Sequence, residues 1–152
     1  MFFSFLLSLF AASSGHADDR HVGYYYPDPV STEVYTSEVP GIPGANRERR
    51  IGFVVTVVNG MLEKPYAPRF SIFAKGAEAE KLLIVALEDG ILDTIYRVRA
   101  QLATLTSVAR STPIFKQVGA TELNFFDLLK MLGFEQLTIS DGDVFAHQVK
   151  VE

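Results

Sequence analysis

The pattern of apolar and polar positions divides the chain into an apolar leader, a proline-rich segment and a regularly patterned body. Residues 1–17 are apolar up to Ala12 and then small and polar. In residues 18–50, four prolines interrupt any helix and push the residues before them toward extended geometry. Regular periodicity follows. The pattern predicts a signal peptide over 1–17, an extended arm rich in Tyr and Pro over 18–50, and one domain over 51–152.

Strands dominate the first half of the predicted domain. Residues 51–58 are a run of apolar, mostly β-branched residues that ends at Asn59-Gly60, which predicts a strand. Shorter strands are expected over 69–74 and 81–87, and the apolar run in the latter predicts a central strand buried on both faces. Within the arm, VSTEVYTSEV is rich in β-branched residues and is expected to form one edge strand.

Two helices and a hairpin complete the pattern. Apolar residues recur at helical spacing from Ile91 to Ala109, and Thr112-Pro113 ends that helix. Asn124 is a good N-cap for a second helix, which Gly133 ends by taking the left-handed conformation. Two alternating strands around Asp141-Gly142 then read as a hairpin.

The order of these elements predicts the fold class. Strands come in runs and do not alternate strictly with helices, which is typical of an α+β protein. We expect an antiparallel or mixed sheet of about five strands, with both helices packed on one face and the arm preceding them.

Composition and charge exclude several classes of function. The net charge is −4 and the pI is about 5.4, so nucleic acid is not an expected partner. The chain has no cysteine, which excludes disulfides, thiolate metal sites and a cysteine nucleophile. We expect neither a metal nor another cofactor, because no phosphate-binding loop, HExxH or GxSxG motif is present.

The leader predicts the compartment. Its apolar stretch is too short to span a bilayer, and Gly15 and Ala17 are suitable small residues for a cleavage site, although no Lys or Arg follows Met1. We expect cleavage after Ala17 and a periplasmic or secreted product without a stable membrane anchor. The alternative is a buried N-terminal helix.

Three consecutive tyrosines, Tyr24, Tyr25 and Tyr26, lie near the expected mature N-terminus. One hypothesis is that they and Tyr35 dock the arm on the sheet, because buried aromatic rings contribute a large apolar area. The other is a binding surface for a small ligand or an envelope protein. Neighbouring residues of an extended chain point to opposite faces, which favours docking over a single binding platform.

The arm closes on RERR, residues 47–50. Three arginines suggest a phosphate or other anion site. The net negative charge of the chain and the presence of Glu48 instead favour a solvent-exposed segment that leads into the strand predicted at 51–58.

His147 is the candidate for chemistry in the body of the domain. It shares one face of the last strand with Phe145, Val149 and Val151. One interpretation is a core histidine, and the other is a general base or metal ligand beside Asp141 and Asp143. These two aspartates are also ordinary hairpin-turn residues.

Several segments in combination resemble a family of short exported bacterial proteins: HVGYYYP, FAKGAEAEKLLIVALEDG, DTIYRVRA, FFDLLKMLGF and SDGDVFAHQV. Its members are often labelled as molybdopterin-guanine dinucleotide biosynthesis protein A. The label implies a nucleotidyltransferase that joins GMP to molybdopterin with Mg²⁺. The resemblance assigns no catalytic residue to this chain.

Three functional hypotheses follow. The first is an exported binding or interaction module of the cell envelope. The second is a periplasmic, hydrolase-like enzyme centred on His147 with Asp141 and Asp143. The third is the nucleotidyltransferase that the family label implies.

Overall fold

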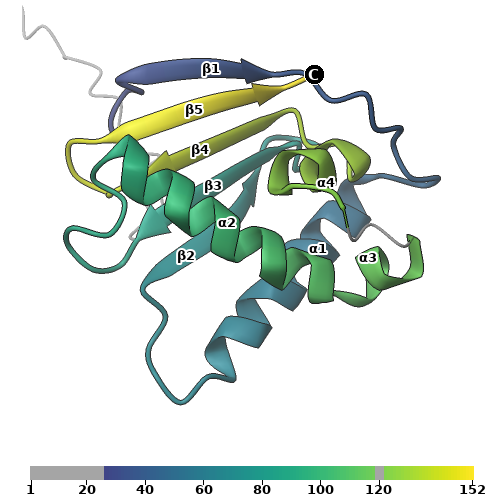
Figure 1. Cartoon of the computed structure of the whole chain (residues 1–152), viewed down its shortest axis with the longest axis horizontal. Helices are drawn as coiled ribbons and strands as arrows, with labels where there is room; N and C mark the ends of the chain where they lie inside the picture. The colour runs from purple at the N-terminus through teal and green to yellow at the C-terminus, as the bar shows by residue number, and fades with distance from the viewer. Residues whose placement is uncertain (1–25, 119–121) are drawn as a thin grey trace, which may run out of the picture.

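A computed structural model describes residues 26–118 and 122–152, so the predicted signal peptide, Tyr24 and Tyr25 lie outside the described residues. A layer of helices covers one face of a five-stranded sheet (Figure 1). The elements in chain order are β1 (Ser31–Tyr35), α1 (Arg47–Leu62), β2 (Phe70–Lys75), β3 (Lys81–Ala86), α2 (Ile95–Ser111), α3 (Pro113–Val118), α4 (Phe125–Met131), β4 (Gln136–Ser140) and β5 (Ala146–Val151).

The sheet is mixed, with strand order β1-β5-β4-β3-β2. β1 lies parallel to β5 and β3 parallel to β4, whereas β2–β3 and β4–β5 are antiparallel pairs. One row of paired residues crosses the whole sheet and faces the helices: Ile72, Ile84, Ile139, His147 and Ser31. This register places His147 on the same side as the hydrophobic core.

One core joins the sheet to the helices. It contains Ile84 and Leu137 from the sheet, Phe53 from α1, Leu105 from α2 and Leu128 from α4. The predicted α+β class is therefore confirmed. The described residues form four helices where the sequence predicts two, because α1 and α3 were not expected.

The predicted strand over 51–58 is wrong, because these residues form the middle of helix α1. A continuous apolar run fits a buried strand or a buried helix equally well, so local features must decide. The deciding feature is Asn46, whose Oδ1 accepts a hydrogen bond from the Arg49 N–H at 3.0 Å and caps the helix. Phe53, Val54 and Val57 then bury one side of the helix.

Most other predicted elements are confirmed. β1 is an edge strand, β3 is central and buried over Leu82–Val85, and α2 ends at Ser111 with Thr112 as its C-cap. Asn124 caps α4, and Phe134 N–H donates to the Leu129 carbonyl after Gly133 at φ 74°. The β4–β5 connection is longer than a two-residue turn, since the strands end at 140 and resume at 146.

The buried Arg50 side chain joins three parts of the fold. Its guanidinium donates to the Glu78 carbonyl in the β2–β3 turn, with distances of 3.0 and 2.8 Å from Nε and Nη2. It also donates to the carbonyls of Leu132 and Gly133 after α4, at 3.2 and 3.4 Å. RERR is therefore the first turn of a helix and not the entry to a strand. Arg50 itself is occupied by backbone carbonyls, which leaves its guanidinium no free edge for an anion.

No helix within residues 26–118 and 122–152 is both long and apolar enough to cross a membrane.

Replacing Arg50 with Met should lower the free energy of unfolding by about 2–4 kcal/mol, because buried carbonyls lose their charged donor. Urea denaturation of the purified protein measures this loss. Arg47→Met is the matched control, since Arg47 is an exposed arginine one turn earlier in the same helix. Equal midpoints for the two variants would contradict the structural role of Arg50.

The β2–β3 turn contains a carboxylate with a perturbed pKa. The N–H groups of Glu80 itself and of Glu78 donate to the Glu80 side chain and hold its pKa below the usual value of 4.5. A depressed pKa stabilises the fold above the unfolded pKa, and this contribution is lost as the pH falls through the folded pKa. Glu80→Gln should therefore show less loss of stability on acidification below about pH 4.5 than the wild type. Urea midpoints at a series of acidic pH values test this expectation, and parallel curves would refute it.

A candidate ligand pocket between helices α1 and α2

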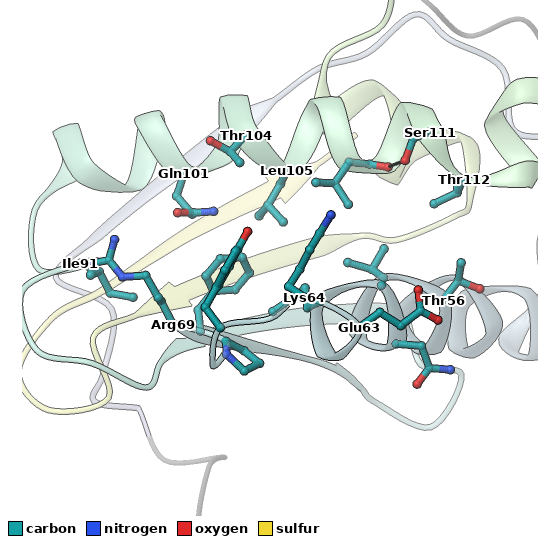
Figure 2. A pocket seen from close by; sticks show the side chains of 18 of the residues that line it. Thr56, Glu63, Lys64, Arg69, Ile91, Gln101, Thr104, Leu105, Ser111 and Thr112 are labelled. Carbon is teal, nitrogen blue, oxygen red and sulfur yellow. Dashed lines mark hydrogen bonds between the residues drawn. The ribbon is translucent and has the colours of Figure 1, made fainter.

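A pocket of about 710 Å³ lies between α1, α2 and the loop that joins α1 to β2 (Figure 2). This volume falls within the usual range for small-molecule sites. α1 packs mainly on β2, whereas α2 packs on α3 and α4, so the two helices do not close against each other. Apolar side chains form much of the lining: Val57, Met61, Phe70, Ile91, Leu105 and Val108.

Hydroxyl groups in the lining are mostly turned back to their own helices. Thr56 donates to the Gly52 carbonyl at 2.8 Å, Ser111 to Val108 at 2.6 Å, and Thr112 to Ala109 at 2.6 Å. Thr104 makes a longer contact of the same kind, 3.4 Å from the Ala100 carbonyl. These hydroxyls no longer have a hydrogen to offer a ligand. The pocket is therefore more apolar than its residue names suggest.

Five polar side chains of the lining have no hydrogen-bond or ion-pair partner within the described residues: Asn59, Glu63, Lys64, Tyr66 and Gln101. Lys64 extends from the loop after α1 toward α2, and Gln101 points from α2 into the same space (Figure 2). Neither side chain has a hydrogen-bond or ion-pair partner within the described ranges. Arg69 lies nearby, but its Nε already donates to Glu88 at 2.8 Å. Lys64 thus supplies a positive charge without an ion-pair partner, and the exposed carboxylate of Glu63 lines the same pocket.

A second, smaller pocket of about 280 Å³ continues along α1 toward its N-terminus. The two pockets share Thr56, Thr112 and Pro113 in their linings. The smaller pocket adds Gly52, Phe53, Arg49 and Ile114.

His147 occupies a different part of the molecule, beneath the edge strand β1. Its ring is 2% exposed, and Nδ1 lies 2.6 Å from the Ser31 Oγ. Nε2 lies 3.7 Å from the Glu33 carboxylate, which is also 3.7 Å from the Arg99 guanidinium. His147 lines neither of the two pockets described above. These contacts give His147 a structural role, because they join β1 to β5.

The aspartates predicted to accompany His147 serve the hairpin loop. One oxygen of Asp141 accepts hydrogen bonds from the N–H groups of Asp143, Val144 and Phe145 at 2.9–3.1 Å. Asp143 is exposed. The carboxylate that faces His147 is Glu33, which the sequence analysis did not single out because it lies on a separate strand.

The described part of the arm docks on the domain. Tyr35 stacks on Phe126 with ring centroids 4.8 Å apart, and its hydroxyl donates to Asp127 at 3.1 Å. Tyr26 is half-buried, with Lys75 Nζ 5.2 Å from its ring centroid. Lys75 lies on β2, at the opposite edge of the sheet from β1, so Tyr26 and Tyr35 contact different parts of the domain.

Metal binding finds no support in the parts of the chain that the structure describes, where no cluster of three or more His, Asp or Glu side chains is placed to hold an ion. The pocket residues Lys64 and Gln101 were missed by the sequence analysis. Lys64 falls in a loop, and Gln101 is only one polar residue on the exposed side of a predicted helix.

Ser31→Ala should lower the free energy of unfolding by about 1 kcal/mol, because one side-chain hydrogen bond between β1 and β5 is lost. Thr32→Ala, on the neighbouring exposed residue, is the control.

A fluorophosphonate probe should leave the wild type unlabelled, since His147 is buried and orders a strand. Labelling that disappears in Ser31→Ala would instead identify Ser31 as a nucleophile.

Comparison with models of protein families, with curated proteins and with solved structures finds no match to this chain. The family resemblance and the nucleotidyltransferase that it implies therefore stay hypotheses.

Proposed function

We propose that this chain is an exported binding module that holds a small organic anion in the pocket between α1 and α2. The observation that carries the proposal is the unpaired Lys64 in a pocket of about 710 Å³ whose lining combines apolar and polar side chains. Ligand sites usually combine an apolar lining with a few polar groups that fix orientation. Lys64 and Gln101 supply those groups here.

The chemistry of the lining supports binding rather than catalysis. The hydroxyls of Ser111, Thr56 and Thr112 donate to helix carbonyls and do not face a base. Lys64 is exposed at the pocket and serves as a point charge for an anion. The expected signal peptide would place this activity in the periplasm or outside the cell, where the ligand is a soluble molecule or part of an envelope component.

A hydrolase-like enzyme is the second candidate, and one contact favours it. The 2.6 Å hydrogen bond between Ser31 and His147 joins a hydroxyl to a base, with Glu33 on the other side of the ring. In this hydrolase-like enzyme, Glu33 would be the carboxylate beside His147, the position that the sequence analysis gave to Asp141 and Asp143. Labelling with the fluorophosphonate probe distinguishes this candidate from a purely structural role of His147.

The anionic dye anilinonaphthalene sulfonate is a suitable probe, because it combines aromatic rings with one negative charge. We expect it to bind the wild type with saturable fluorescence enhancement. Lys64→Ala should weaken this binding about three- to fivefold through loss of an exposed charge contact. Thr104→Trp should weaken it further by filling the pocket mouth.

Lys150→Ala is the matched control, since Lys150 is an exposed lysine on β5 outside the pocket lining. Circular dichroism of each variant verifies that the fold is retained. Equal dye affinity for wild type, Lys64→Ala and Thr104→Trp would place the dye elsewhere and refute the pocket as the binding site.

A further inference from the structure

The two pockets lie one after the other along α1, and together they are called the α1 groove hereafter. Their shared lining residues, Thr56, Thr112 and Pro113, mark where they meet. Along α1, Gly52 lines the smaller pocket, Thr56 lines both, and Gly60 lines the larger one. Eight residues of helix separate the two glycines, which is about 12 Å. The space is therefore long and narrow rather than round.

The glycines keep this groove open at a cost to the helix. A Cβ placed on Gly52 or on Gly60 would meet no atom within 4 Å, so the fold itself does not require glycine at either position. Glycine within a helix costs about 1 kcal/mol relative to alanine. A ligand that lies close to the helix backbone is a physical reason to omit both side chains.

The part of the α1 groove beside Thr56 and Thr112 suits a body without hydrogen-bonding groups, whereas the exposed Glu63 brings a carboxylate to the lining between Thr56 and Lys64. The hydroxyls of Thr56 and Thr112, where the pockets meet, are already donated to helix carbonyls. A bound peptide would bring an N–H and a C=O with every residue, and buried polar groups without partners cost several kcal/mol. A hydrocarbon chain loses nothing in the same place and gains from burial.

Charge defines one end of the ligand. Lys64, from the loop that follows α1, and Gln101, from α2, line the larger pocket from opposite walls, and both side chains are without partners in the described chain. At the opposite end, Phe53 and Ile114 close the smaller pocket, with the exposed Arg49 at its rim. A carboxylate bound between these two walls would accept hydrogen bonds from the Lys64 ammonium and from the Gln101 amide.

We infer that the α1 groove binds a long-chain carboxylate, with its carboxylate at Lys64 and Gln101 and its hydrocarbon chain running past Thr56 toward Ile114. This inference rests on the proposed function and names the ligand class for the same site. The chain length that the groove accepts is set by the open space above Gly52.

The test measures displacement of anilinonaphthalene sulfonate by octanoate, decanoate, dodecanoate and tetradecanoate, all below their micelle concentrations. Wild-type affinity should rise with each added pair of methylenes until the groove is full, by up to about fourfold for each methylene that becomes buried. Gly52→Leu should abolish the gain for the longer chains and leave octanoate unchanged, because its side chain enters the open far end. Gly52→Ala, which adds one methyl group, should shorten the preferred chain less.

Variants at the two cations report the orientation of the ligand. Lys64→Ala should weaken every carboxylate by a similar factor of about three to five, and dodecanol should bind as weakly to the wild type as dodecanoate does to Lys64→Ala. A larger loss in Arg49→Ala than in Lys64→Ala would overturn the stated orientation. Dye binding that depends on Lys64 but carboxylate affinities that do not rise with chain length would refute this inference and leave the proposed function standing. Failure of both the dye and the carboxylates to bind would refute both.

Discussion

The position of helix α1 depends on the buried guanidinium of Arg50. Burying a positive charge is unfavourable unless its donors are satisfied, and here carbonyls from the β2–β3 turn and from the end of α4 satisfy them. The carbonyls after a helix carry partial negative charge, which suits a cation. One side chain thus fixes the first turns of α1 relative to the sheet and to α4. The remaining length of α1 then diverges from α2 and forms one wall of the α1 groove.

The α1 groove exists because the side chains of α1 and α2 do not fill the space between these two helices. Phe53 joins α1 to α3 through an edge contact with Phe115, with ring centroids 5.8 Å apart, so α1 and α3 meet near one end of the α1 groove. Toward the other end, Gly60 and the loop after α1 leave the space open. The lining hydroxyls are satisfied within their own helices, so the empty groove carries little penalty for unsatisfied polar groups. A rigid scaffold with an apolar, preformed space is a reasonable basis for binding.

The sequence predicted the fold class and most elements because their signals are local. The N-cap at Asn124 and the left-handed Gly133 are set by neighbouring residues, and both are confirmed. Residues 51–58 were misassigned because an apolar run fits a buried strand or a buried helix, and the deciding N-cap, Asn46, lies upstream in a segment that was predicted as an extended arm. The candidate site residues were likewise predictable only as far as they depend on local sequence. His147 was placed on the correct face of its strand, but its partner Glu33 is distant in the sequence and reaches it only through the pairing of β1 with β5. The α1 groove was missed altogether, since one of its walls is the helix that was predicted as a strand.

The most direct measurement is the map of amide chemical shifts in a ¹H–¹⁵N NMR titration of the protein with dodecanoate. We expect the perturbed amides to cluster from Gly52 in α1 to Lys64 in the loop after it, and from Gln101 to Thr112 along α2 and its C-cap, whereas those of β1 and His147 stay in place. Shifts centred on Ser31 and His147 would move the site to the sheet edge. A titration that perturbs no cluster of amides would show that the α1 groove does not bind this class of ligand.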